Sequence, residues 1–316
     1  MRGAKRPGNA AACVGGTLLC LLLGVVIALG GAIGVSYFQN RSFKETFYEI
    51  SSSKVEDRLR IIQISDLHEA KYENLVKRVQ TLAPDLIVFT GDLVSYDTVD
   101  ETAVVELCGQ LAEIAPAFYV YGNHERRRQY GSSLGKEEIK ALAAEKGVPD
   151  DGFDFRLVED DLRDQMEAVG VSVLHNEQAT VQVGDTAVDI FGVLTATFDG
   201  FYRCAEEQFY DYAYEDYEHF KLMLLHEPYL TDWIEEEWGD LILCGHTHGG
   251  MVRIPLLGGL FEDNYGVFPE FLNDGKILGL YSVGDIPLIV SSGMANRDLL
   301  RINNKPELVV VDINHY

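Results

Sequence analysis

The chain has 316 residues, 47% of them hydrophobic, which is enough to bury one substantial core, although length alone would allow two domains. Its formal net charge is -24 at pH 7, and because residues 1–40 hold three basic and no acidic side chains, the remainder carries -27. Nucleic-acid binding depends largely on neutralising phosphates with Lys and Arg, so this acidity argues against a DNA or RNA partner.

The first predicted element is an apolar segment near the N-terminus. Residues 7–40 carry no charge, and the stretch from Val14 to Val35 is almost wholly apolar. Its length is close to the ~20 residues that cross a bilayer as a helix. A cleaved signal peptide is the alternative, but the stretch exceeds the usual signal core of ~7 to 15 residues and no Ala-x-Ala site follows it. The sequence therefore predicts an uncleaved transmembrane helix.

Basic residues before this segment predict its orientation. Arg2, Lys5 and Arg6 precede it, and such residues favour the cytoplasmic side of a membrane. We expect a single-pass protein of the cell membrane whose folded domain lies outside the cytoplasm. The predicted division is a short basic cytoplasmic tail at 1–9, a transmembrane anchor at 10–40 and one domain at 41–316.

Five short apolar runs, interrupted only by Gln63 in the first, predict strands that are buried on both faces, because they are rich in branched residues. They are Ile61–Ile64, Leu86–Phe89, Phe118–Val120, Leu222–Leu225 and Leu241–Leu243. A polar cluster follows each run: Asp66-Leu67-His68, Gly91-Asp92, Gly122-Asn123-His124-Glu125, His226-Glu227-Pro228 and Gly245-His246-Thr247-His248. Ligands bind at the carboxyl ends of strands in open α/β sheets, so we expect these clusters to meet at one edge of a sheet.

The remaining pattern predicts a single layered α/β domain. Further strands are expected at Thr46–Ile50, Val171–Leu174, Ala179–Val183, Ala187–Phe191, Ile277–Val283, Leu288–Val290 and Leu308–Ile313. Helices are expected at Tyr72–Leu82, Glu101–Ile114, Lys136–Lys146 and Arg156–Val169, the last two in an inserted segment near residues 126–170.

The polar clusters carry the donors of a site for two metal ions. Asp66 and His68 are two residues apart, so on an extended segment they project to the same side, and His246 and His248 repeat that spacing. Asp92 suits an anionic ligand that bridges two ions. Imidazole, carboxylate and amide oxygen together fit manganese, iron or zinc better than calcium. Two such ions ~3.5 to 4 Å apart can clamp a phosphoryl group while a bridging water attacks it.

The five clusters, in this order, resemble the calcineurin-like metallophosphoesterases. Arg253-Ile254-Pro255 and the tail from Arg301 to Leu308 also resemble the bacterial membrane-anchored or exported branch. The resemblance implies a layered β-sandwich core flanked by helices, here preceded by the transmembrane helix. It also implies a ligand set for two divalent metals: Asp66, His68 and His248 on one, Asn123, His226 and His246 on the other, and Asp92 as the bridge. His124 resembles the histidine that protonates the leaving oxygen, a role suited to an imidazole.

This sequence departs from the family pattern at one position close to the bridging residue. The family commonly carries an acidic residue three positions after the bridging aspartate, where this chain has Ser95, with Asp97 two further on. The resemblance therefore does not identify the residue that holds Asp92 in position. Because of the insertion between Glu125 and Val171, the resemblance also does not identify the residues at the rim of the substrate site.

The sequence thus predicts a metal-dependent phosphoesterase. A phosphodiester or pyrophosphate substrate is favoured, on a lipid head group or envelope component, because the predicted anchor holds the domain near a bilayer. The alternatives are a phosphomonoesterase acting on protein or small molecules, and a non-catalytic metal-binding ectodomain. No protein partner is predicted. Candidates for the substrate rim are Arg126–Arg128, Tyr202–Phe220 and Arg301, although a charge run is more often a solvated face.

Overall fold

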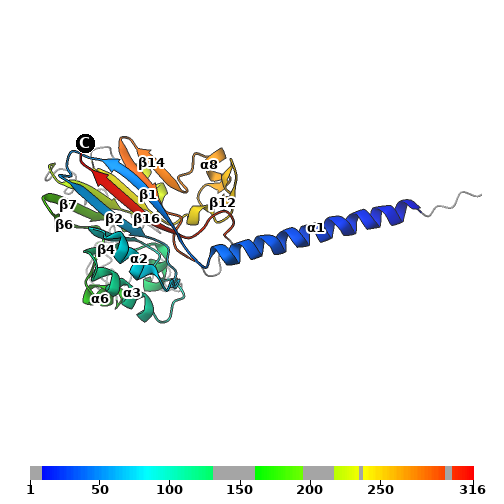
Figure 1. The fold of residues 1–316 in the computed structure, drawn as a ribbon, viewed down its shortest axis with the longest axis horizontal. Coiled ribbons are helices and arrows are strands. Elements are labelled where there is room, and N and C mark those ends of the chain that lie inside the picture. The colour runs from blue at the N-terminus through cyan, green and yellow to red at the C-terminus, as the bar shows by residue number, and fades with distance from the viewer. Residues whose placement is uncertain (1–8, 131–160, 195–216, 235–237, 296–300) are drawn as a thin grey trace, which may run out of the picture.

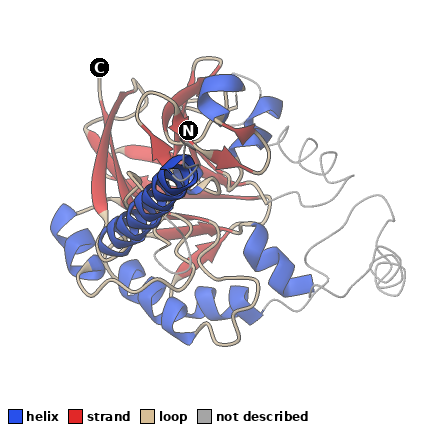
Figure 2. Cartoon of the chain, turned by 90° about the vertical axis from the view of Figure 1, so that its right-hand side faces the viewer, coloured by secondary structure: helices blue, strands red, loops and turns tan. Residues whose placement is uncertain are grey.

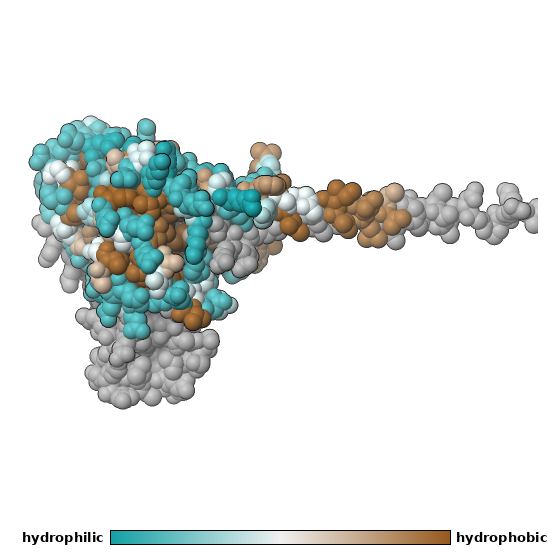
Figure 3. Space-filling view, turned by 60° about the horizontal axis from the view of Figure 1, so that its bottom comes forward, coloured by the Kyte–Doolittle hydropathy of each residue, from teal (hydrophilic) through white to brown (hydrophobic). Residues whose placement is uncertain are grey.

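The computed structural model describes residues 9–130, 161–194, 217–234, 238–295 and 301–316. Helix α1 (Asn9–Gln39) extends away from the body of the molecule (Figure 1). Large apolar side chains on it, such as Leu19, Ile27 and Ile33, are more than 60% exposed and form part of its apolar surface (Figure 3). Among the described residues, no helix meets the length and apolarity needed to cross a membrane.

Two six-stranded sheets form the body. The first runs in the order β1 (Lys44–Ser51), β16 (Glu307–Asn314), β2 (Arg58–Ile64), β3 (Leu86–Thr90), β4 (Ala117–Val120) and β5 (Val171–Val173). The second runs β14 (Gly279–Val283), β15 (Ile286–Val290), β9 (Leu241–Cys244), β8 (Phe220–Leu224), β7 (Thr186–Gly192) and β6 (Glu177–Val183). Strands β2 to β5 are parallel, as are β15, β9, β8 and β7. Every strand expected from the sequence is present.

The sheets stack into a sandwich because the central strands are apolar on both faces. On β2, Leu59 and Ile61 pack between the two sheets, whereas Ile62 and Ile64 face the helices. Those helices are α2 (Leu75–Leu82), α3 (Thr102–Ala112) and α6 (Asp161–Ala168), which cover the outer face of the first sheet (Figures 1 and 2). Burial of each such side chain contributes roughly 1.5–3 kcal/mol. The expected β-sandwich core flanked by helices is confirmed.

Three predicted helices differ in their observed bounds, and α3 is shorter than the expected Glu101–Ile114 by one residue at its start and two at its end. Helix α2 begins at Leu75 instead of Tyr72, because the Tyr72 hydroxyl donates to the Met294 carbonyl at 2.7 Å and its ring packs edge-on against Phe43. The helix expected at Arg156–Val169 is described from residue 161 as α6, and the one expected at Lys136–Lys146 lies outside the described residues.

Short elements connect the strands near the edge where the polar clusters lie. They are the helix α4 (Asn123–Tyr130), the 3-10 turns η2 (Pro228–Trp233) and η3 (His248–Gly250), the two-residue strands β10 (Arg253–Ile254), β11 (Gly258–Gly259), β12 (Phe261–Glu262) and β13 (Gly266–Val267), and α8 (Pro269–Leu272). The two hairpins, β10–β11 and β12–β13, are antiparallel. The sequence did not predict them, since two residues carry no periodicity.

Candidate metal centre

The five polar clusters converge where the strands end. Asp66 follows β2 by two residues and Asp92 follows β3 by two, while Asn123 begins α4 just after β4. His226 follows β8, and His246 and His248 follow β9 in the second sheet. All seven predicted ligands and His124 therefore meet at one edge of the sandwich, as the strand pattern predicts.

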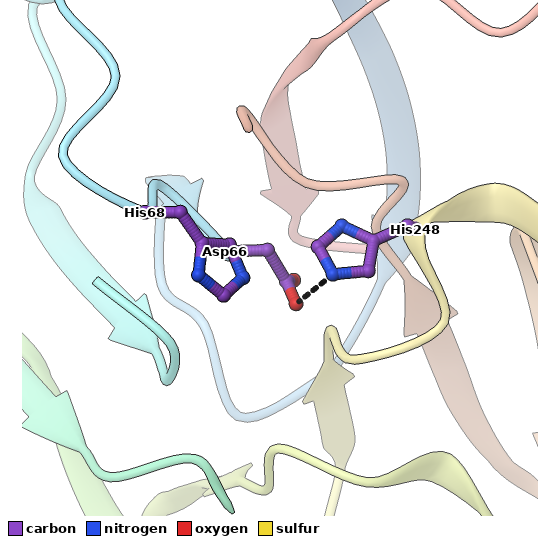
Figure 4. Close-up of side chains that lie close together, drawn as sticks. All are labelled: Asp66, His68 and His248. Carbon is purple, nitrogen blue, oxygen red and sulfur yellow. Dashed lines mark ion pairs between the residues drawn. The ribbon is translucent and has the colours of Figure 1, made fainter. Parts of the chain in front are cut away.

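Asp66, His68 and His248 form the first group of possible metal ligands. One atom of each lies within 4.8 Å of the others, and His248 Nε2 is 3.7 Å from Asp66 Oδ1 (Figure 4). Figure 4 shows the Asp66 carboxylate between the two imidazole rings. Asp66 is fully buried, whereas both histidines are partly accessible. This is the set predicted for one metal.

The second group joins Asp92, His226 and His246 within the same distance. His246 Nδ1 lies 3.3 Å from His226 Nε2 and 3.0 Å from Asn123 Oδ1. Asn123 therefore adds its amide oxygen to this group. These four residues contain the set predicted for the other metal.

Asp92 lies between the two groups. Its Oδ2 is 3.1 Å from His226 Nε2 and 3.8 Å from His68 Nε2. The carboxylate thus contacts a histidine of each group, the position that a bridging ligand requires. Which of the two metals each residue binds, and that Asp92 bridges them, remain predictions from the sequence.

The second ring nitrogen of several histidines has a fixed partner, which determines which nitrogen can bind a metal. His226 Nδ1 donates to the Thr90 carbonyl at 2.7 Å, so Nε2, which faces Asp92 at 3.1 Å, is the nitrogen that can release its proton and bind a metal. His246 is reversed: Nδ1 faces the second group, and Nε2 lies 3.8 Å from the Glu262 carboxylate. In both residues one ring nitrogen is directed into the centre.

His124 lies beside the centre with its ring held by a backbone group. The amide of Tyr96 donates to its Nδ1 at 3.2 Å, and its Nε2 is 3.9 Å from Asp92 Oδ2. A neutral ring that accepts at Nδ1 carries its hydrogen on Nε2. His124 also lines the pocket described below.

The donor set fits two divalent ions. Nε2 of His68 is a buried nitrogen without a hydrogen-bond partner among the described residues, and it points toward the Asp92 carboxylate. A cation between them would satisfy both groups. Imidazole nitrogens with carboxylate and amide oxygens are ligands for manganese, iron or zinc.

Burial and mutual contacts perturb the ionisation of these ligands. Burial raises the pKa of Asp66 to about 6, although His226 nearby opposes the shift. Burial also disfavours the charge on Asp92, but contact with His226 lowers the Asp92 pKa well below its ordinary value. The same contact raises the pKa of His226 well above its ordinary value despite burial. A metal needs free lone pairs, so protons on Asp66 and His226 leave as it binds.

Glu125 is a structural residue of the centre that the ligand set omits. Its buried carboxylate accepts from the amides of Asp92, Leu93 and Gly122 at 2.6–2.9 Å, and from the Tyr119 hydroxyl. It therefore holds the loop that carries Asp92. Its place within the Gly122-Asn123-His124-Glu125 cluster is the feature of the sequence that could have indicated this role. No such feature indicates that Glu69 and Glu262 lie near the centre.

A pocket of about 340 Å³ opens onto the centre. Its walls include Asp92, Asn123, His124, Tyr229, Phe261 and Glu262. Of the three arginines that were candidates for the rim, Arg126 does not lie there, because it is only 2% exposed. The side chains of Arg127 and Arg128 and most of Tyr202–Phe220 lie outside the described residues.

Arg301 is also buried, so it does not line the rim. Its guanidinium donates to the carbonyls of Ala295 and Ser292 at 3.0 and 2.8 Å. The Met294 amide in turn donates to Asp66 at 3.2 Å, and the Arg301 amide donates to the Ser36 hydroxyl of α1. Arg301 thus braces the segment behind Asp66.

Gly91 permits the close approach of three ligand loops. Its φ is +87°, and a Cβ there would lie 2.4 Å from His226 Nδ1 and 2.7 Å from the Gly122 nitrogen. We expect Gly91→Ala to lower the free energy of unfolding by about 2–5 kcal/mol, from left-handed strain plus overpacking. Urea unfolding would measure it.

Gly184→Ala is the matched control, because Gly184 has a φ of +57° with open space around it. It should show only the backbone strain of about 1–2 kcal/mol. Equal losses in the two variants would contradict the close packing inferred at Gly91.

Comparison with protein-family models matches residues 59–250 to the calcineurin-like phosphoesterase family. The matched stretch holds all seven predicted ligands and His124. The polar clusters, their order and their convergence therefore coincide with the region that defines this family.

Individual relatives are similar over most of the chain. Phosphodiesterase YaeI of Escherichia coli (strain K12) is 25% identical over 262 residues, which cover 80% of this chain and 82% of that protein. Uncharacterized metallophosphoesterase YkuE of Bacillus subtilis (strain 168) is 26% identical over 309 residues, 92% of each chain. UDP-2,3-diacylglucosamine pyrophosphatase LpxG of Chlamydia trachomatis serovar D is 25% identical over 226 residues, 62% of this chain and 65% of that protein.

Proposed function

Because the chain belongs to the calcineurin-like phosphoesterase family and is therefore a hydrolase of phosphoric ester bonds, we propose that it cleaves a phosphodiester or pyrophosphate on a lipid-linked substrate. The observation that carries the proposal is the pocket over the centre, whose wall combines metal-ligand candidates with the exposed ring of Phe261. The names of two relatives, a phosphodiesterase and a diacylglucosamine pyrophosphatase, support the same substrate class.

Exposed apolar side chains beside the pocket support a substrate with acyl chains. The hairpin patch is defined here as five side chains that are 36–63% exposed on β12, β13 and α8 and just before β12: Leu260, Phe261, Val267, Phe271 and Leu272. Phe261 pairs with Val267 in the hairpin, and the Phe268 amide donates to Leu260, which keeps these residues together. Figure 1 shows β12 and α8 on the side of the body from which α1 extends.

A membrane position for the enzyme is part of the proposal. It rests on the uncharged run at 7–40 and on the basic residues before it, which favour a tail at 1–9 in the cytoplasm and the domain at 41–316 outside it. Only four residues separate α1 from β1. An anchor so close to the domain would keep the pocket near lipid head groups.

The proposed chemistry assigns separate tasks to the residues of the centre. Asp66, His68 and His248 would hold one divalent ion, Asn123, His226 and His246 the other, and Asp92 would contact both. When bound, such ions supply positive charge for the phosphate and activate water as the nucleophile. His124 donates the hydrogen on Nε2 to the departing oxygen, and Glu125 keeps the Asp92 loop in place.

Two nitrophenyl esters test the reaction class. The full chain in detergent, supplied with manganese, should hydrolyse bis-(p-nitrophenyl) phosphate faster than p-nitrophenyl phosphate, and a chelator should abolish both reactions. Preference for the monoester would support a phosphomonoesterase and contradict the proposal. Failure to cleave either ester would contradict it as well.

The hairpin patch provides a separate test of the substrate class. We expect a double variant, Phe271→Asp with Leu272→Asp, to lower hydrolysis of UDP-2,3-diacylglucosamine in mixed micelles while sparing the soluble bis ester. The expected loss is roughly tenfold or more, because charging two apolar contacts removes ~1.5–3 kcal/mol each. Leu280→Asp, an equally exposed leucine on β14, is the control. If the double variant loses the same fraction of its wild-type rate on both substrates, a lipid-binding role is contradicted.

A further inference from the structure

Ser95 occupies the position where the family commonly carries an acidic residue, and its hydroxyl lies near a predicted ligand. Ser95 Oγ is 3.2 Å from His68 Nδ1. The same hydroxyl donates to Glu69 Oε2 at 3.0 Å, and the Ser95 amide donates to Glu69 Oε1 at 2.6 Å. A serine thus connects the ring of His68 to the carboxylate of the next residue in the chain.

The direction of these hydrogen bonds follows from the groups involved. The Ser95 hydroxyl donates its single hydrogen to the Glu69 carboxylate oxygen. The Ser95 oxygen is then left to accept from His68, which places the ring hydrogen on Nδ1. Nε2 of His68 consequently carries a lone pair, and it is the nitrogen that faces Asp92 at 3.8 Å.

The backbone holds the three residues in register. The loop after β2 pairs with the loop after β3 through the amides of His68 and Glu69, which donate to the carbonyls of Asp92 and Leu93 at 3.1 Å. His68 and Glu69 both have left-handed backbones, with φ of 45° and 54°, a conformation that is strained for such residues. The Thr98 hydroxyl also donates to Glu69. The Glu69 carboxylate is therefore fixed from two sides.

We propose that Glu69 and Ser95 form a relay that orients His68 and fixes its hydrogen on Nδ1. Both are positioning residues, since neither lines the pocket. The inference rests on the proposed assignment of His68 as a metal ligand. Asp97, the nearest acidic residue further along the loop, is exposed and lies outside the relay.

Metal binding provides the first test. We expect Ser95→Ala and Glu69→Gln each to weaken binding of one of two manganese ions by about 10- to 100-fold in calorimetric titration, leaving the other site unchanged. The double variant should lose little more than Ser95→Ala alone, because Glu69 acts through Ser95. Asp97→Asn, a carboxylate in the same loop, is the control and should match the wild type. Wild-type affinity at both sites in Ser95→Ala would overturn the relay.

The hydrogen position on His68 provides a test that needs neither metal nor substrate. In histidine-labelled protein treated with chelator, nitrogen NMR should show a protonated Nδ1 and an unprotonated Nε2 for His68, a signal assigned by its loss in His68→Gln. Ser95→Ala should give a mixture of the two tautomers. If Ser95→Ala lowers only the melting temperature and keeps the tautomer, the residue is merely structural and the relay is wrong. A correct tautomer in a protein that cleaves no diester would instead count against the proposed function alone.

Discussion

Substitution of Asp92 by Asn is expected to leave the protein unable to hold two metal ions and to lower its phosphoesterase activity by about two to four orders of magnitude. Asp92 contacts a histidine of each ligand group, so its negative charge serves both. Asparagine keeps the shape and the oxygen that accepts from the His124 amide at 2.9 Å. The loss would therefore report the charge and not the packing.

Elemental analysis after equilibration with manganese would count the ions per chain, and hydrolysis of the bis ester would give the rate. Asp285→Asn, in the exposed turn between β14 and β15, is the control for removing one acidic group. An Asp92→Asn protein with two ions and normal turnover would refute the bridging role.

Replacement of His124 by Gln is expected to lower kcat by about 100- to 10,000-fold while both metals stay bound. The residue belongs to neither of the two predicted ligand sets, it lines the pocket, and a neutral ring that accepts at Nδ1 carries its hydrogen on Nε2. An acid is needed most when the leaving oxygen is basic. The loss should therefore be larger for an alkyl ester than for a nitrophenyl ester, whose leaving group departs without a proton.

Rates with the two kinds of ester, together with the metal content, separate the possible outcomes. His219→Gln is the matched control, since His219 pairs with Asp189 in the second sheet, away from the centre. An equal loss for both esters would show that His124 positions the substrate without donating a proton. Full activity with an alkyl ester would exclude the acid role.

The strands and the ligand clusters could be predicted because their signals are local. Leu241–Leu243 is an uninterrupted apolar run and Ile61–Ile64 is broken only by Gln63, and each ends within a residue of the point where the observed strand ends. A strand buried on both faces requires such a run, and a polar residue at its end has to lie at the sheet edge. The positions of Asp66 and His246 follow from these two facts.

The supporting residues could not be predicted because they depend on turns and on tertiary contacts. Glu69 reaches Ser95 only because of its left-handed backbone, which the sequence does not indicate for a glutamate. Glu262 approaches His246 from a two-residue strand without periodicity. Arg126 is buried although a run of three arginines normally indicates a solvated face. The partners of Glu69 and Glu262 are distant in sequence.

The candidate ligands are divided between the two sheets of the sandwich. Asp66, His68, Asp92 and Asn123 follow strands of the first sheet, whereas His226, His246 and His248 follow strands of the second. An ion bound by residues of both sets would hold the two sheets together at this edge of the sandwich. Thermal resistance and protease resistance should then rise together with metal concentration, because an ion that binds only the folded state shifts unfolding by mass action. In enzyme without bound metal, the two sheets are therefore expected to separate first at this edge.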